Sequence, residues 1–549
     1  MTFKNSTDKF TKFLKKNKWI IIASIIFIIW KFFLIGILWQ DRVSPPEPDD
    51  SFIYIANIES VRNCSTFIFC QDSVYNLNTT SGYEHLSYRL IFGTLGKILN
   101  INSFQVFHLS FYIGIILLIP TLVYFLKSLN QDKKIIAFSL LFLALYNGNG
   151  SYHGFYWVVP SFFSLMLFFL IFSIIDLGNK HYKLLLFLTV PIFAYMHSIS
   201  IYLMMLIPIH YAIYSISLKK INLTKLKRIV FSILIFAIFY IPSTIHLSNF
   251  SKNNPYGASS LLKKSYEDMS MQLSQAKDIK TANISKEKHI KSDPIYNNKS
   301  INIYLPGLKN ITNNYLNWVF FNWLGASVSI LMLTILFLNK AYKLLSIYAT
   351  AIFFMLASSI IEYGERSLIF VWPITFILFA QGTWLSLKFL KNNVHLNKFA
   401  FKILASIAIG LFLYININYS FFLNFNQNKN ANFNIPSSFI NYIPYSADKS
   451  DTIFMDPKLV KIYESLAVME KRSLPYKRVS TMEDANFYYY LNYNEASSEY
   501  VEKNNFMHNF IRITGFKESV PLQRTLEVPI NFVLCKEFGS VQIYKNIEI

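Results

Sequence analysis

The chain has 549 residues, of which 53% are hydrophobic, 17% aromatic and only 15% charged, and its formal net charge is +21. This composition excludes an ordinary soluble protein, in which about 25% of residues are charged. The positive charge also excludes nucleic acid as the partner, because the cations are gathered in short loops between long apolar runs.

Eleven apolar runs follow one another along the chain. A hydrocarbon core about 30 Å thick needs roughly 20 apolar residues per helical crossing, and helices satisfy every backbone polar group there. The third and fifth runs are short, so each is expected to tilt or dip rather than to cross simply. The runs are Trp19 to Trp39, Ser103 to Leu126, Ile135 to Tyr146, Trp157 to Ile175, Leu184 to Met196, Ile199 to Leu218, Ile229 to Leu247, Leu316 to Leu338, Tyr342 to Ile361, Ser367 to Leu387 and Phe401 to Leu423.

The loops between these runs alternate in charge. One set is rich in lysine and holds few acids, among them Asp132 and Asp176, whereas the opposite set holds Asp41, Glu47 and Glu362 with few cations. Positive loops stay in the cytoplasm. The pattern predicts a multi-pass protein of the inner membrane with a cytoplasmic N-terminus, a retained signal anchor and, after eleven crossings, an extracytoplasmic C-terminus.

The first outer loop, residues 40 to 87, carries two adjacent carboxylates directly after the first crossing. Asp49 and Asp50 follow three prolines and open an expected helix that also contains Tyr54. A carboxylate held there can accept the proton of a sugar hydroxyl as a general base. A solvated turn in which Asp49 or Asp50 caps a helix would show the same pattern.

Further candidate residues lie on the same predicted side of the membrane. Glu84 and His85 precede an amphipathic stretch that ends near Asn102, and His153 and His197 lie on the next outer turns. Glu84 and His85 are placed to face a lipid-linked phosphate, although an interfacial helix boundary would also look like this. A single histidine is usually structural. His153 and His197 are functional candidates only because both are predicted to lie on the same side of the membrane as Asp49.

A Glu-Arg turn precedes the tenth run. Arg366 at a helix N-terminus offers a guanidinium and free N–H groups to a phosphate oxygen, and Glu365 stands beside it. An arginine that pairs with Glu362 or Glu365, or that lies among lipid headgroups, is the alternative. Lys31 lies near the middle of the first run, where burying an ionisable side chain in the membrane costs free energy, and no role is assigned to it.

The remaining polar segments are a long outer loop, 248 to 315, and the chain from 425 to 549. The long loop is expected to hold an amphipathic helix over Leu261 to Ala276. The second segment predicts a small extracytoplasmic α/β domain, with strands at Thr452 to Met455 and Asn531 to Cys535, a helix at Pro457 to Glu470 and a final hairpin across Gly539 and Ser540. Cys64 and Cys70 are either a disulfide or two free thiols.

Taken together, the Pro48-Asp49-Asp50 segment with Tyr54, the amphipathic stretch before the second crossing, the outer histidines and the Glu365-Arg366 turn resemble the GT-C superfamily of integral membrane glycosyltransferases. The resemblance covers residues 1 to 424, the transmembrane domain. It implies a mainly α fold, a bundle of about eleven transmembrane helices, with the small α/β domain outside.

The resemblance also implies an activity. Such enzymes move a sugar from a polyprenyl-phosphate-linked donor to an acceptor, here a cell-envelope glycan, lipid or protein, with inversion at the anomeric carbon. Asp49 or Asp50 would be the base and Arg366 would contact the donor phosphate. Some relatives hold a divalent metal with spaced acids, whereas Asp49 and Asp50 are adjacent, so no cofactor is firmly expected and the metal remains open.

Two other functions stay open. An O-antigen polymerase or ligase also has many crossings and a large outer loop, but it relies on basic and histidine residues there, and the long loop of this chain is lysine-rich and low in complexity. A transporter of lipid-linked glycans predicts charged residues in several crossings and repeated halves. The runs here contain little beyond Lys31.

Overall fold

The computed structural model describes most of the helices and part of a C-terminal sheet. The described residues are 3–39, 48–63, 85–129, 132–145, 148–149, 152–153, 155, 157–178, 180–219, 221–253, 323–359, 368–393, 452–455, 477–478, 487–491, 530–538 and 541–547. The predicted amphipathic helix at 261–276, the eleventh run, the helix at 457–470 and the pair Cys64 and Cys70 lie outside these residues.

Ten of the eleven apolar runs coincide with helices. These are α1 (Phe3–Trp39), α4 (Ser103–Leu129), α5 (Lys133–Leu145), α6 (Pro160–Leu177), α7 (Tyr182–Ala194), α8 (Ser200–Leu218), α9 (Leu223–Asn253), α12 (Trp323–Leu338), α13 (Tyr342–Ser359) and α14 (Leu368–Asn393). Within the described residues, five helices are long and apolar enough to cross a membrane, namely α1, α4, α6, α8 and α14. The protein is therefore a multi-pass membrane protein, while the total of eleven crossings stays a prediction.

The two short runs form short helices. Helices α5 and α7 have 13 residues each, which corresponds to about 20 Å at 1.5 Å per residue. That length is less than the hydrocarbon core of about 30 Å. Helix α9, by contrast, is longer than its predicted run, because it continues to Asn253, beyond the predicted start of the long loop at 248.

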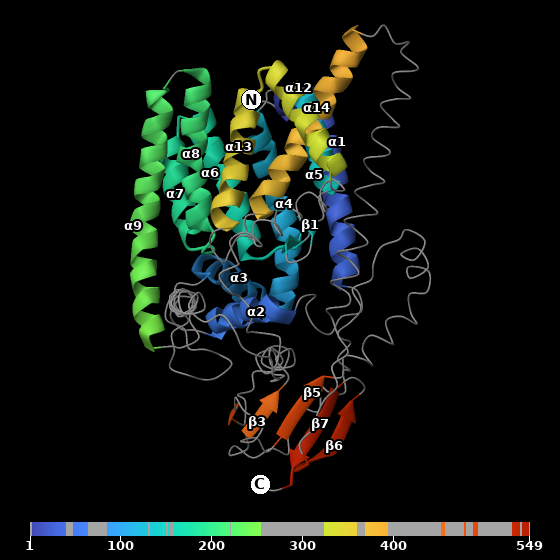
Figure 1. The fold of residues 1–549 in the computed structure, drawn as a ribbon, viewed down its shortest axis with the longest axis vertical. Helices are drawn as coiled ribbons and strands as arrows, with labels where there is room; N and C mark the ends of the chain where they lie inside the picture. The colour runs from blue at the N-terminus through green and yellow to red at the C-terminus, as the bar shows by residue number, and fades with distance from the viewer. Residues whose placement is uncertain are drawn as a thin grey trace, which may run out of the picture.

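The bundle is organised around α6. This helix packs against α4, α7 and α8, and nearly all its side chains are buried, including the aromatic ladder of Phe168, Phe169 and Phe172. Helix α9, at the edge of the bundle in Figure 1, instead exposes apolar side chains such as Leu234 and Ile238. An apolar outer face is what a helix in contact with lipid presents, because lipid rather than water is its solvent.

Two helices lie across one end of the bundle. Helices α2 (Pro48–Asn63) and α3 (Leu86–Leu99) are found at the end opposite the N-terminus in Figure 1. The predicted amphipathic stretch before the second crossing is confirmed as α3. Between α5 and α6, the two-residue strands β1 (Gly148–Asn149) and β2 (Tyr152–His153) pair antiparallel on the predicted outer link.

The C-terminal part contains a five-stranded sheet, drawn beyond α2 and α3 in Figure 1. Its order is β4 (Lys477–Arg478), β3 (Thr452–Met455), β5 (Phe487–Leu491), β7 (Val541–Asn546) and β6 (Phe532–Phe538). Strand β3 is parallel to β4 and β5, and β7 is antiparallel to β5 and β6. The predicted β3 strand and the final hairpin are confirmed, and the domain limits 425–549 remain a prediction.

Candidate active site

Helix α2 starts where the acidic pair stands. Pro48 is its first residue, a position that suits proline because its missing N–H needs no partner there. Asp49 and Asp50 therefore lie in the first turn, where the partial positive charge of the helix N-terminus favours carboxylates. The structure gives their place on the backbone, while their side chains lie outside the described part. Asp50 stands one turn before Tyr54, on the same face of α2.

Tyr54 leads directly to His85. The two rings meet edge to face, with centroids 5.3 Å apart and planes at 77°. Both side chains are buried. His85 precedes α3 and has a φ of 53°, in the left-handed region that histidine tolerates better than most residues. This backbone conformation turns the chain from the first outer loop into α3.

His85 in turn stacks on His197, with ring centroids 5.0 Å apart and planes at 24°. His197 lies in the turn between α7 and α8. A backbone hydrogen bond from Ser87 N to the carbonyl of Tyr195, 3.1 Å long, holds the start of α3 against the same turn. Three of the predicted site residues, Tyr54, His85 and His197, are thus brought together from three separate segments.

The hydrogen bonds of the two histidines select opposite tautomers. Nδ1 of His85 lies 3.2 Å from the carbonyl oxygen of Met196, and because a carbonyl only accepts, this Nδ1 carries a proton. Nδ1 of His197 accepts the backbone N–H of Ile199 at 3.0 Å. In their neutral forms, His85 keeps its lone pair on Nε2 and His197 carries its proton on Nε2. Nε2 of His85 can therefore accept a hydrogen bond, and Nε2 of His197 can donate one.

A second polar group fixes α2 against α4. The buried carboxylate of Glu59 accepts from Arg62 Nη1 at 2.5 Å and from the hydroxyl of Ser103, the first residue of α4. Tyr88 on α3 bonds Ser110 on α4 at 3.1 Å. These contacts hold the platform that carries Tyr54 and His85. Sequence reasoning missed them, because Glu59 and Ser103 look like ordinary loop and cap residues.

Helix α3 packs on α2 through glycine. A Cβ atom at Gly93 would stand 2.6 Å from Cβ of Val61, and one at Gly96 would stand 2.9 Å from Cδ of Arg62. A side chain at either position would force the two helices apart. Arg89, also on α3, is 1% exposed. Sequence reasoning left this buried cation beside the site without a role.

The other predicted site residues are placed only in part. His153 is in β2, opposite Gly148, and its side chain is outside the described part; Glu84, Glu365 and Arg366 lie outside it altogether. Lys31 is fully buried in α1, with its Nζ 5.8 Å from the ring centroid of Phe27. Among the described residues, no group of three or more His, Cys, Asp or Glu side chains is close enough to hold a metal ion.

No family model matches the sequence, and no curated protein aligns with it significantly. Solved structures do resemble the fold. ArnT from Cupriavidus metallidurans, in its apo state, shares 9% identity and a TM-score of 0.50, over 96% of this chain and 96% of its own. The oligosaccharyltransferase of Archaeoglobus fulgidus shares 12% identity over 90% of this chain and 68% of its own, with a TM-score of 0.48.

The oligosaccharyltransferase AglB from the same archaeon has been solved in complex with an inhibitory peptide and a dolichol-phosphate, and this structure has a TM-score of 0.44 to the chain at 12% identity. ArnT and AglB are both GT-C membrane glycosyltransferases. The likeness to ArnT spans nearly the full length of both chains, so the predicted resemblance to the GT-C superfamily is confirmed at the level of the fold.

Proposed function

We propose that this chain, which has the fold of the GT-C glycosyltransferases, moves a sugar from a polyprenyl-phosphate-linked donor to a glycan, lipid or protein of the cell envelope. The reaction takes place at the α2–α3 end of the bundle, on the extracytoplasmic side. The observation that carries the proposal is the cluster of Tyr54, His85 and His197, which lies one turn along α2 from Asp49 and Asp50.

The reaction assigned to this end is a single displacement. An acceptor hydroxyl attacks the anomeric carbon while the bond from that carbon to the phosphate oxygen breaks, so the configuration inverts. The proton of the hydroxyl passes to Asp49 or Asp50, and the lipid phosphate departs with the electron pair. A positioned carboxylate contributes about 10² to 10⁴-fold as a general base.

The reaction also requires that the negative charge on the departing phosphate be stabilised. Arg366, two residues before α14 in sequence, is assigned to this charge. Glu365, next to it in sequence, and Glu84, which precedes His85, are assigned to substrate binding. Fixed donors directed at developing charge often contribute more to catalysis than any other single effect. The Nε2–H of His197 supplies a further donor, and Nε2 of His85 an acceptor for a sugar hydroxyl, because their Nδ1 atoms are committed to Met196 and Ile199.

The test is a transfer assay with purified protein reconstituted in nanodiscs. Polyprenyl-phosphate sugars of different identity serve as donors, cell-envelope extracts as acceptors, and release of lipid phosphate is measured with sugar incorporation. We expect transfer by the wild type that is lost in D49N/D50N. Asp132→Asn is the control, because Asp132 directly precedes α5 at the opposite end of the bundle and Asn also caps a helix.

Transfer that persists in D49N/D50N would remove the acidic pair from the chemistry. The absence of transfer from every donor by well-folded wild type would reject the proposed reaction. Thermal unfolding of each variant shows whether the fold is retained.

A further inference from the structure

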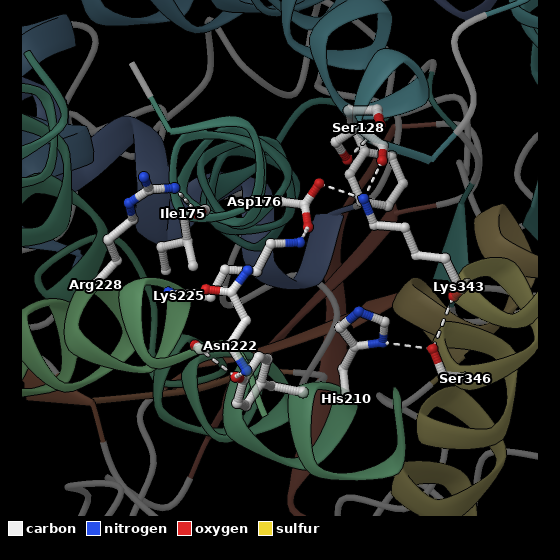
Figure 2. Close-up of polar contacts among 11 residues, drawn as sticks. Ser128, Ile175, Asp176, His210, Asn222, Lys225, Arg228, Lys343 and Ser346 are labelled. Atoms are coloured by element: carbon white, nitrogen blue, oxygen red, sulfur yellow. Dashed lines mark hydrogen bonds and ion pairs between the residues drawn. The ribbon is translucent and has the colours of Figure 1, made fainter. Parts of the chain in front are cut away.

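A group of charged residues joins the helices at the end of the bundle that holds the N-terminus (Figure 2). Asp176, near the end of α6, accepts from Nζ of Lys225 at 2.6 Å through Oδ1 and from Nζ of Lys343 through Oδ2. Lys343 also donates to the carbonyl of Ser128, near the end of α4. One carboxylate is therefore shared by two ammonium groups from α9 and α13.

Arg228 adds a third cation one turn after Lys225. Its Nη1 donates to the carbonyl of Ile175 at 3.0 Å, and its guanidinium lies 5.1 Å from the ring centroid of Tyr182. In the described part of the chain, it forms no ion pair, and its buried Nε–H has no hydrogen-bond acceptor. Arginine is the residue best suited to bind phosphate oxygens through two parallel bonds. Among the described residues, Arg228 thus faces the Ile175 carbonyl and the Tyr182 ring but no carboxylate.

The guanidinium is also held firmly in place. A Cβ at Gly178 would overlap Nη1 of Arg228, so the arginine lies directly on this glycine, which follows α6 with a φ of 67°. Its position between Gly178 and the Tyr182 ring leaves it little freedom. A cation that is ordered before a ligand arrives loses less entropy on binding.

The residues around Arg228 suit a lipid headgroup. On one side of Arg228, α7 and α9 pack side by side and expose Leu188 (54%), Val230 (47%) and Leu234 (57%), an outer face suited to acyl chains. Three exposed lysines, Lys180, Lys183 and Lys227, adjoin Gly178, Tyr182 and Arg228 in sequence. The site thus combines an apolar wall with an excess of cations at its polar margin.

We propose that Arg228 and the three exposed lysines bind the phosphate of an anionic phospholipid in the leaflet at the N-terminal end, with its acyl chains along α7 and α9. Charge complementarity and the adjoining lipid-facing wall carry this assignment. Each cation near a membrane surface strengthens binding to anionic lipid by about fivefold. This site lies at the opposite end of the bundle from α2 and α3, and it does not depend on the proposed sugar transfer.

The experiment is native mass spectrometry of the full chain, released from detergent with phosphatidylglycerol or phosphatidylcholine. We expect the wild type to retain phosphatidylglycerol in preference and Arg228→Gln to reduce that retention about five- to tenfold. Lys134→Gln is the matched control, an exposed cation at the same end on α5, which packs against α1 and α14. Equal retention by Arg228→Gln and wild type would overturn the proposal.

Two further measurements test whether misfolding explains a loss of lipid and whether the site binds any phosphate. The triple variant K180Q/K183Q/K227Q changes exposed side chains only and is expected to lower phosphatidylglycerol retention while thermal stability stays unchanged. Retention that is unaffected in this variant would overturn the role of the lysines. Displacement of the lipid by millimolar inorganic phosphate would show a general anion site and also contradict the lipid assignment.

Discussion

His85 and His197 stack face to face although they come from different parts of the chain, one before α3 and the other between α7 and α8. Their hydrogen bonds to Met196 O and from Ile199 N give them opposite neutral tautomers. The pair therefore presents one acceptor and one donor nitrogen at the end of the bundle where α2 begins. Tyr54, whose ring packs on His85, lies one turn after Asp50 on the backbone of α2.

The first prediction concerns His85→Asn. Asparagine also tolerates a positive φ, and its amide can still donate to Met196 O, but it lacks the stacked ring and Nε2. We expect sugar transfer to fall about two- to tenfold, as for the loss of one hydrogen bond worth about 0.5 to 1.5 kcal/mol, and Tm to fall as well, because the buried ring between Tyr54 and His197 is lost. Transfer rates with each donor, measured beside thermal unfolding, check this. Wild-type rates in this variant would remove His85 from the site.

The second prediction concerns the contacts of Glu59 with Arg62 and Ser103, which join α2 to α4 and are called the Glu59 clamp. Glu59→Ala leaves Arg62 and Ser103 without their shared acceptor, and loss of one partner from a buried charged pair costs about 3 to 5 kcal/mol. Unfolding of the purified protein by denaturant should show this loss. A double-mutant cycle with Ser103→Ala should be non-additive by more than about 0.5 kcal/mol, because the two side chains bond each other. Strict additivity would mean that the clamp does not form.

The third prediction uses two glycines as a matched pair. Gly178→Ala places a Cβ where Nη1 of Arg228 lies and also requires a φ of 67°, whereas a Cβ at Gly36 has no atom within 4 Å. The left-handed backbone alone costs an L-residue about 1 to 2 kcal/mol. We expect Gly178→Ala to lower Tm markedly and Gly36→Ala to leave it nearly unchanged. Arg228→Ala should recover part of the loss at Gly178, and equal effects of both glycine changes would contradict the packing.

The fourth prediction concerns Asp176, which binds Lys225 and Lys343 at once. Asp176→Asn leaves two partly buried ammonium groups without a charged partner, so it should destabilise the protein more than Lys225→Met, which leaves the pair of Asp176 and Lys343 intact. Thermal unfolding in one detergent compares the two. A smaller effect of Asp176→Asn would show that other groups neutralise the lysines.

The fifth prediction tests orientation. Cys535 in β6 is exposed, and an extracytoplasmic C-terminal sheet predicts that a thiol reagent unable to cross membranes labels it in intact cells. The C64S/C70S background leaves it as the only thiol, and Lys134→Cys added to C64S/C70S/C535S reports the opposite end. Labelling of Lys134→Cys but not of Cys535 in intact cells would invert the predicted topology.

The membrane class, the positions of ten helices, the β3 strand and the final hairpin were all predictable from local signals. Apolar runs and charge alternation act within one segment, so no knowledge of distant neighbours is needed. Helix ends were less accurate. Helix α9 continues through polar residues to Asn253, because backbone hydrogen bonding can extend a helix beyond its apolar stretch.

The sequence singled out Tyr54, His85 and His197 as candidates, and their contacts with one another became known only from the structure. Tyr54 was singled out within the motif after the first crossing, His85 as a residue that could face a lipid-linked phosphate, and His197 because it shares their predicted side of the membrane. The Glu59 clamp and the close packing at Gly93 carried no local signal, since each depends on an element far along the chain. The shared role of Asp176 was hidden for the same reason.

Hydropathy and charge along the chain were enough to establish that this protein lies in a membrane, how its helices succeed one another and where its polar residues gather, because both are properties of short segments. The stacking of His85 on His197 and the seating of Arg228 against Gly178 became known only from the folded molecule. Such contacts depend on how helices from distant parts of the chain pack, and packing is set by the shapes of both surfaces at once.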